Sequence, residues 1–309
     1  MQHRTLGRTG LSVTRLGFGA MEIRGPRIWS GRPVTDQQAG SILNAVLDSG
    51  INFIDTSPDY GTSEAFIGRF ISWRRKEYFL ATKCGCTVVN MGDRDETPHV
   101  WTRDNLLRNI EESLRRMKTD HVDILQLHNP AVEVAEENRL VDALREIQRA
   151  GHTRFISISS ALPQLATFLE WGVFDTFQIP YSALERTHEE WITRVSEAGA
   201  GTIIRGGVAK GMLSEGRRMG RRWEPWRAAK LDEIRGQMSR MEFMLRFTLS
   251  HPHADTVIVG TLNPKHLEDN LAAASRGPLP PDVYADAKWR LSAVGEDPAA
   301  AADGPGRVW

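Results

Sequence analysis

The sequence predicts an α/β fold, a single-domain (β/α)8 barrel, from three observations. Eight short apolar runs occur along the chain, segments with helical spacing lie between most of them, and no linker divides the chain. Alternation of buried strands with helices indicates a parallel sheet, because parallel strands need crossover connections. Eight such units in roughly 280 residues fit a closed barrel better than an open sheet. A doubly wound sheet is the alternative, but no GxGxxG motif follows the first strand.

The predicted strands are short and mostly apolar. They are residues 14–19, 52–55, 78–83, 122–128, 154–159, 174–180, 201–205 and 255–260. Three of the intervening helical patterns end at a glycine (Gly50, Gly151 and Gly199), which is a typical helix stop signal. The paired turn glycines of RTLGRTGLSV predict an N-terminal β-hairpin before the barrel. We expect the barrel domain to span residues 1–294 and the Gly/Pro-rich residues 295–309 to form a flexible tail.

Composition limits the classes of partner. The 309 residues include 39 basic and 39 acidic side chains, and the formal net charge is zero. This balance argues against nucleic acid or an acidic membrane surface as the main partner, and the partner we expect is the small-molecule substrate identified below. No run of 18 apolar residues occurs, so we expect neither a membrane span nor a leader segment. We therefore expect a cytoplasmic protein, whose oligomeric state the sequence leaves open.

The two cysteines, Cys84 and Cys86, lie in KCGCT. A disulfide between two cysteines so placed on one predicted strand is not expected. Two thiols also cannot complete a four-ligand zinc site without distant histidines. The sequence therefore predicts reduced thiols and no metal site.

Polar residues at the predicted strand ends form the candidate active site. Barrel active sites lie at the carboxyl ends of the strands. The second strand ends at Asp55 with Tyr60 in the following loop, the third ends at Lys83 and the fourth ends at His128. Each residue alone also has a structural interpretation, as a turn former, a surface ring, a strand end or a core histidine. Their convergence at consecutive strand ends predicts a single site.

This set suits proton donation to a carbonyl oxygen while hydride reaches the carbonyl carbon. A free tyrosine titrates near pH 10, and the ammonium of Lys83 would lower the pKa of Tyr60. Asp55 would keep Lys83 charged, and His128 could hydrogen-bond the carbonyl oxygen. No side chain supplies hydride, so the scheme requires a nicotinamide cofactor.

The sequence resembles the aldo-keto reductases, a superfamily of NAD(P)H-dependent carbonyl reductases built on this barrel, and in particular its bacterial members. The resemblance extends from LGRTGLSVTRLGFGAM to VIVGTLNPKHLEDNL. GINFIDTSPDYGTSEAFIG is similar to the family's first signature, and NIEESLRRMKTDHVDILQLH is similar to its second. The resemblance assigns the family's catalytic tetrad to Asp55, Tyr60, Lys83 and His128.

The resemblance also implies a set of cofactor-binding residues. The set is Gly19, Ala20, Met21, Asp55, Ser159, Ser160, Gln178, Arg205, Gly206, Val208, Lys210, Gly211, Ile258, Gly260, Thr261, Asn263, His266, Asp269 and Asn270. Ser160 stands where the family usually has asparagine, and Arg205 stands where it often has an aromatic ring. NADPH is the family's usual cofactor, but Lys265 is the only strong cation in the last loop, so NADH or dual use remains open.

Loops after the strands would determine substrate specificity. We expect Trp29, Trp101, Trp223 and Trp226 near the substrate, although each is equally consistent with a core or surface position. The function predicted is reversible hydride transfer between NAD(P)H and an aldehyde or ketone, with Tyr60 as general acid. The alternative is a nucleotide-binding regulatory protein resembling the β subunits of potassium channels. The intact tetrad favours the enzyme.

Overall fold

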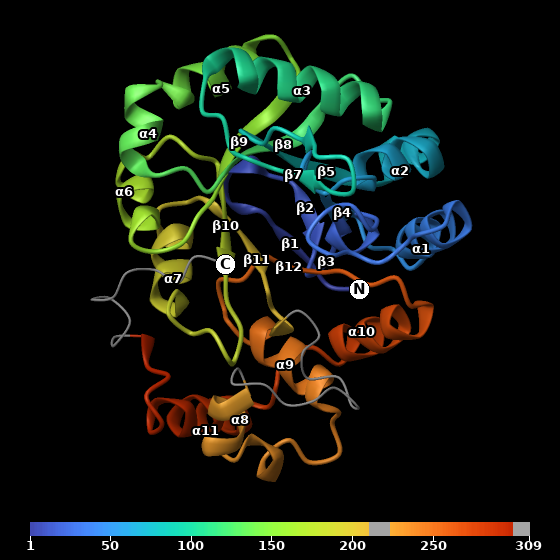
Figure 1. Ribbon diagram of the computed structural model, residues 1–309. Helices are drawn as coiled ribbons and strands as arrows, with labels where there is room; N and C mark the ends of the chain where they lie inside the picture. Colours follow the sequence, from blue (N-terminus) through green and yellow to red (C-terminus); the bar gives the residue numbers. More distant parts are fainter. Residues whose placement is uncertain (210–222, 299–309) are drawn as a thin grey trace.

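Eight parallel strands close into a barrel in the computed structural model, which describes residues 1–209 and 223–298 (Figure 1). Around the barrel the order is β3, β4, β5, β8, β9, β10, β11 and β12, and β12 pairs with β3 to close it. The bounds are β3 (Leu16–Gly19), β4 (Phe53–Asp55), β5 (Phe79–Cys84), β8 (Val122–His128), β9 (Thr153–Ser159), β10 (Thr176–Pro180), β11 (Gly201–Arg205) and β12 (Thr256–Val259). The predicted (β/α)8 barrel is confirmed.

Helices surround the barrel (Figure 1). They are α1 (Asp36–Asp48), α2 (Ser63–Phe70), α3 (Arg103–Met117), α4 (Val132–Glu137), α5 (Leu140–Arg149), α6 (Gln164–Glu170), α7 (Glu189–Glu197), α8 (Glu224–Ala228), α9 (Arg240–Leu249), α10 (Pro264–Arg276) and α11 (Pro281–Ser292). Polar caps define several helix starts: Thr35 forms a capping box with Gln38 at α1, and Thr102 caps α3. The main hydrophobic core lies between the helices and the outer faces of the strands.

The predicted N-terminal hairpin is present and closes one end of the barrel. Strands β1 (His3–Thr5) and β2 (Ser12–Thr14) pair in antiparallel register. Leu6, Leu11 and Val13 belong to one buried cluster with Phe53 and Ile203, which lie at or near the starts of their strands. The hairpin therefore covers the amino-terminal end of the barrel with apolar side chains and leaves the carboxyl ends of the strands for polar residues.

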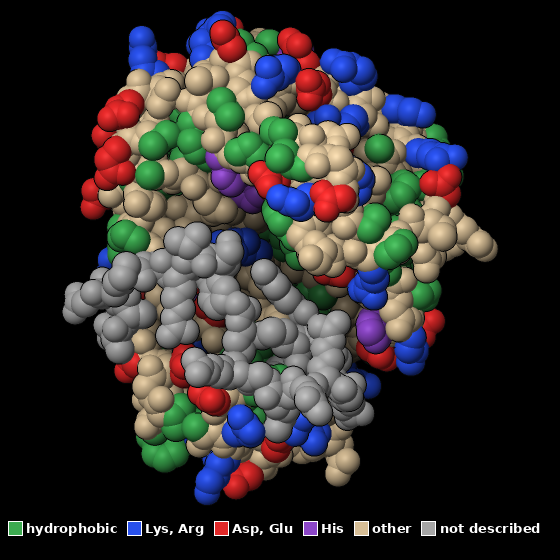
Figure 2. Space-filling view, in the orientation of Figure 1, with side chains coloured by type: hydrophobic (Ala, Val, Ile, Leu, Met, Phe, Trp, Pro, Cys, Tyr) green, Lys and Arg blue, Asp and Glu red, His purple; other side chains and the backbone are tan. Residues whose placement is uncertain are grey.

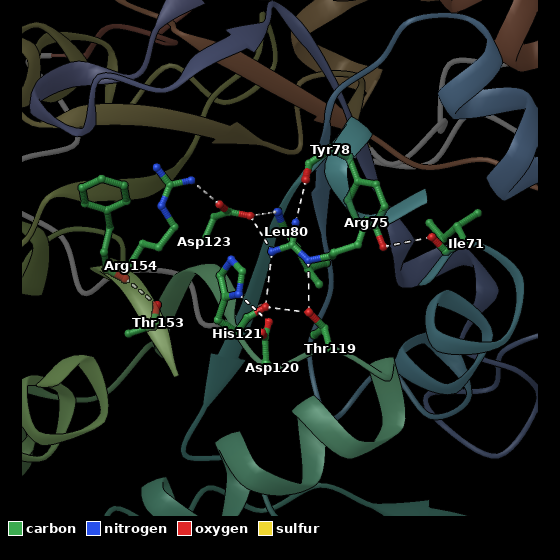
Figure 3. Close-up of polar contacts among 11 residues, drawn as sticks. Ile71, Arg75, Tyr78, Leu80, Thr119, Asp120, His121, Asp123, Thr153 and Arg154 are labelled. Carbon is green, nitrogen blue, oxygen red and sulfur yellow. Dashed lines mark hydrogen bonds and ion pairs between the residues drawn. The ribbon is translucent and has the colours of Figure 1, made fainter. Parts of the chain in front are cut away.

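An ionic network around the buried Asp123 carboxylate ties three strands together near their amino-terminal ends (Figure 3). The Asp123 carboxylate in β8 accepts hydrogen bonds from Arg75 Nη2 at 2.7 Å, from the Leu80 backbone N–H at 2.8 Å and from Arg154 Nη1 at 2.7 Å. Leu80 lies in β5 and Arg154 in β9. The network lies at the opposite ends of these strands from the carboxyl ends, so we expect it to contribute to stability.

The segment 87–101 contains a short hairpin that the sequence did not predict. Strands β6 (Val89–Asn90) and β7 (Asp95–Glu96) pair in antiparallel register. Arg27 Nη2 lies 2.6 Å from Asp95 Oδ1, so this hairpin is tied to the segment that follows β3. Among residues 1–209 and 223–298, every helix is too short or too polar to span a bilayer. The predicted tail lies mostly outside the described residues and stays a prediction.

Candidate active site

The centre of the site is a buried ion pair between neighbouring strands. Asp55 ends β4, and Lys83 lies one residue before the end of β5. Lys83 Nζ lies 2.8 Å from Asp55 Oδ2 and donates a second hydrogen bond to the Thr56 carbonyl at 2.8 Å. Burial alone would lower the pKa of Lys83, but the Asp55 carboxylate and the neighbouring acidic phenol of Tyr60 raise it above its ordinary value. Lys83 is therefore an ammonium at neutral pH.

Two amide side chains fix the orientation of Asp55. Gln126 Nε2 and Gln178 Nε2 each donate to Asp55 Oδ1 at 2.8 Å. Gln178 was predicted to bind the nicotinamide carboxamide, and its amide nitrogen here supports Asp55. Gln126 was not predicted from the sequence, although it lies two residues before His128 in β8 and so shares its face of the strand.

Tyr60 lies beside this ion pair. The centre of its ring is 4.8 Å from Lys83 Nζ, and the rings of Trp29 and His128 lie edge-on at 5.9 Å and 6.4 Å. Gly61 follows with φ +46°, and a Cβ there would overlap the Arg24 carbonyl, so the turn that places Tyr60 requires glycine. Burial raises the pKa of Tyr60 to about 12, and the opposing charge of Lys83 does not offset it. Lys83 does lower the pKa of Tyr60, as predicted, but burial raises that pKa by more.

His128 contacts two side chains that the sequence did not assign to the site. Its Nδ1 lies 3.1 Å from Cys86 Sγ and 3.3 Å from Asp59 Oδ2. Asp59 is buried; burial alone would raise its pKa, but the charge of His128 and hydrogen bonding with it hold the pKa well below its usual range. Both contacts are made by Nδ1, so Nε2 is the ring nitrogen that neither Cys86 nor Asp59 contacts.

The residues predicted to bind the nicotinamide cofactor lie at the ends of the remaining strands. The Ser159 hydroxyl at the end of β9 donates to Asn129 Oδ1 at 3.4 Å, and the Ser160 backbone N–H donates to the Gln178 carbonyl at 3.1 Å. Gly19 ends β3 and is followed by Ala20 and Met21 in a 3-10 turn. The Asn129 amide lies beside Ser159 and was not predicted from the sequence.

The loop after β12 leads into α10. A Cβ on Gly260 would overlap the Gly19 carbonyl, so the loops after β3 and β12 meet closely. Asn263 caps α10 by accepting from the Lys265 N–H at 3.0 Å. Lys265 Nζ lies 3.0 Å from Asp269 and 3.5 Å from Glu268, so the only cation of this loop is already paired. The remaining predicted residues here are Ile258, Thr261, His266 and Asn270, of which His266 is exposed.

Comparison with known proteins agrees with this geometry. The sequence model of the aldo/keto reductase family matches residues 15–288. The chain belongs to the aldo/keto reductase family. The uncharacterized oxidoreductase YqkF of Bacillus subtilis is 27% identical over 294 residues, 89% of this chain and 92% of YqkF. L-galactose dehydrogenase of Arabidopsis thaliana is 28% identical over 88% of each chain.

Solved structures of aldo-keto reductases have the same fold as this chain. The holo form of the aldo-keto reductase AKR11C1 from Bacillus halodurans superposes with a TM-score of 0.82 at 27% identity, covering 94% of this chain and 96% of that one. As a member of this family, the chain is an NAD(P)H-dependent oxidoreductase.

The carboxyl ends of the strands in this aldo/keto reductase fit a nicotinamide nucleotide. Arg205 ends β11, and its Nε is buried without a hydrogen-bond partner among the described residues. Burial holds the pKa of Arg205 below its ordinary value, although the neighbouring acidic groups of Glu185, Tyr60 and Asp55 oppose this lowering. An unpaired buried donor near Tyr60 suits a polar ligand. Gly206 and Val208 follow it; Lys210 and Gly211, also predicted to bind the cofactor, lie outside the described residues.

The four tryptophans predicted near the substrate separate into two pairs. Trp29 contacts Tyr60, and Trp101 stacks on His99 with ring centres 5.3 Å apart. Trp223 and Trp226 are instead buried, 2% and 0% exposed, and Trp226 packs edge-on against Phe243. Among the described residues this second pair belongs to the core, because a tryptophan within a helical segment covers apolar surface as readily as it lines a pocket. Figure 2 shows histidine side chains beside a hollow near the centre of one face.

Proposed function

We propose that this reductase transfers hydride from NAD(P)H to an aldehyde or ketone, with Tyr60 donating the proton. The observation that carries this proposal is the Asp55–Lys83 ion pair, with Nζ held 4.8 Å from the centre of the Tyr60 ring. A charged, immobilised ammonium beside a neutral phenol suits a proton donor that must become an anion.

Each side chain has a distinct role. Bound nicotinamide supplies the hydride. Tyr60 carries its proton at neutral pH, because its pKa is raised to about 12, and gives that proton to the carbonyl oxygen. Lys83 stabilises the phenolate that remains, and Asp55 keeps Lys83 charged. His128 positions the carbonyl oxygen through the ring nitrogen that Asp59 and Cys86 do not contact. Oxidation of the alcohol uses the same groups in reverse.

The loop after β12 supports use of both cofactors. NADPH carries a 2′-phosphate, and Lys265 is the cation that could contact it. Lys265 is exposed and paired with Asp269 and Glu268, and surface pairs of this kind are worth about 0.2–1 kcal/mol. Lys265 therefore gains little binding free energy when it exchanges these carboxylates for the 2′-phosphate of NADPH. We expect NADPH and NADH to bind with affinities within about tenfold of each other.

Trp29 and Trp101 are the aromatic side chains placed to contact a substrate. Trp29 follows β3 and Trp101 follows β5, the two neighbours of β4, and Tyr60 lies in the loop after β4. Trp29 is half-exposed. A flat aromatic surface favours a carbonyl with an apolar or ring-shaped body. One relative is named L-galactose dehydrogenase, so aldoses belong in any substrate panel beside aliphatic and aromatic aldehydes.

The test combines nucleotide binding with turnover. Titrations of intrinsic fluorescence with NADPH and NADH, run side by side, measure affinity, and a carbonyl panel followed by nicotinamide absorbance measures reduction. Binding with turnover of at least one carbonyl supports the enzyme. Binding without turnover on the whole panel, together with a stable protein partner, would favour the regulatory alternative.

A further inference from the structure

Four side chains around His128 form one compact cluster. The cluster consists of Asp59, Cys86, His99 and His128, and one donor atom from each lies within 4.8 Å of all the others. Asp59 and Cys86 come from the loops after β4 and β5, and His128 ends β8. His99 precedes α3, but its backbone forms an antiparallel bridge with Cys86, which brings it to the same point.

The donor types match one metal ion. A thiolate, two imidazoles and a carboxylate suit Zn2+, whereas Mg2+ and Ca2+ prefer oxygen ligands. Zinc bonds of about 2.0–2.3 Å in tetrahedral geometry place ligand atoms about 3.3–3.6 Å apart. His128 Nδ1 lies 3.1 Å from Cys86 Sγ and 3.3 Å from Asp59 Oδ2. Coordination would require His128 and Cys86 to move slightly apart and the most widely separated donor atoms, which lie up to 4.8 Å from each other, to move closer together.

Hydrogen bonds within the cluster do not provide a partner for every buried polar atom in it. The single Nδ1 of His128 carries at most one proton, yet Asp59 and Cys86 both contact that atom. Asp59 is 1% exposed, and its Oδ1 is buried with no hydrogen-bond partner among the described residues. A buried carboxylate oxygen without a partner is costly, and a bound cation would satisfy it.

Charge and access also fit a divalent cation. The Asp59 carboxylate and a Cys86 thiolate together neutralise two positive charges, and the nearest cation, Lys83, is already paired with Asp55. Asp59 and Cys86 are buried, but His99 is exposed. An ion can therefore reach the cluster from solvent at His99.

We propose that Asp59, Cys86, His99 and His128 form a Zn2+ site beside the catalytic residues, with His128 bound through Nδ1. Binding displaces the Cys86 thiol proton, and any proton on Nδ1, to solvent. His128 then carries its remaining proton on Nε2, the nitrogen that faces away from the metal. The site thus fixes both the orientation and the tautomer of His128.

Metal binding is measured on the full chain, free of any affinity tag, stripped with a chelator and kept reduced under anaerobic conditions. Co2+ serves as the spectroscopic probe, and Zn2+ is then added in competition with a chromogenic chelator. We expect one ion per chain, a near-ultraviolet thiolate-to-Co2+ charge-transfer band, intense visible bands from tetrahedral Co2+ and displacement of Co2+ by Zn2+ but not by Mg2+.

Matched variants locate the ion. Cys86→Ala should abolish the charge-transfer band, and His99→Gln should weaken Zn2+ binding by at least about tenfold. The controls are Cys84→Ala, a buried thiol that donates to the Gln126 carbonyl, and His121→Gln, a histidine that contacts Asp120. Both controls should bind Zn2+ as the parent does. Circular dichroism confirms that each variant is folded.

Three results would overturn the proposal: no charge-transfer band in the parent, equal displacement of Co2+ by Mg2+, or unchanged Zn2+ affinity in folded His99→Gln. His99 is exposed, so this last variant is informative even where substitution of buried Cys86 prevents folding. The assay reads no turnover, so its outcome is independent of the proposed reductase activity.

Discussion

Asp55 Oδ2 lies 2.8 Å from Lys83 Nζ, and both side chains are buried at the carboxyl ends of neighbouring strands. Gln126 and Gln178 hold the second carboxylate oxygen, so the pair has one defined geometry. A buried pair of this kind becomes strongly destabilising when one partner is lost, because the other charge is left in the interior. The arrangement links the stability of the barrel to the charge state of Lys83.

Asp55→Asn should therefore lower turnover by at least about a hundredfold and the free energy of unfolding by about 3 kcal/mol. Lys83 would lose its counter-charge and become neutral more readily, so it would no longer stabilise a phenolate. Steady-state kinetics and denaturant unfolding measure the two effects. Asp36→Asn, at an exposed pair with Arg69, is the control and should change neither. Wild-type turnover in Asp55→Asn would contradict the role given to the pair.

The rate of reduction should not fall through ionisation of Tyr60 at any pH below about 10. The folded pKa of Tyr60 is raised to about 12 from its ordinary value of 10.0, so the fold favours the neutral phenol. The associated stability is complete below pH 10 and is lost as the pH rises toward 12. Tyrosinate absorbance of the parent minus that of Tyr60→Phe measures this titration. A difference signal that titrates between pH 7 and 9 would show that Lys83 dominates over burial.

Asp123→Ala should lower the free energy of unfolding by about 1–3 kcal/mol without weakening nucleotide binding. The substitution leaves Arg75 and Arg154 without their shared carboxylate and the Leu80 N–H without its acceptor. Urea unfolding and nucleotide titration measure the two quantities. Asp120→Ala, at an exposed residue in the same region, should change stability by no more than about 0.5 kcal/mol. Equal effects in the two variants would mean that the network adds nothing to stability.

Lys265→Ala should change the ratio of NADPH to NADH affinity by less than about tenfold, because Lys265 is exposed and shared with Asp269 and Glu268. Fluorescence titration of both nucleotides measures the ratio, and Lys118→Ala in a distant helix cap is the control. A parent preference for NADPH above a hundredfold that disappears in Lys265→Ala would assign discrimination to this single side chain.

Sequence reasoning predicted the barrel because eight apolar runs alternate with helical spacing, a pattern that depends on local burial. The strands β6 and β7 contain two residues each, too few for any periodicity to reveal. The signal for Gln126 was present, since it shares a strand face with His128. Asp59, Cys86 and His99 lie together only through tertiary contacts between loops, whereas the prediction of no metal site considered only the two thiols. Trp223 and Trp226 were assigned by residue type alone; both are buried, and their contact with a substrate stays a prediction.

The most direct test of the account is Tyr60→Phe, which removes one oxygen and keeps the ring beside Lys83. Single-turnover reduction of a carbonyl and fluorescence titration with NADPH and NADH are measured on the same preparation. If Tyr60 donates the proton, reduction falls by at least about a hundredfold while nucleotide affinity stays within about threefold of the parent. Reduction near the parent rate would contradict the assignment of Tyr60 as the proton donor.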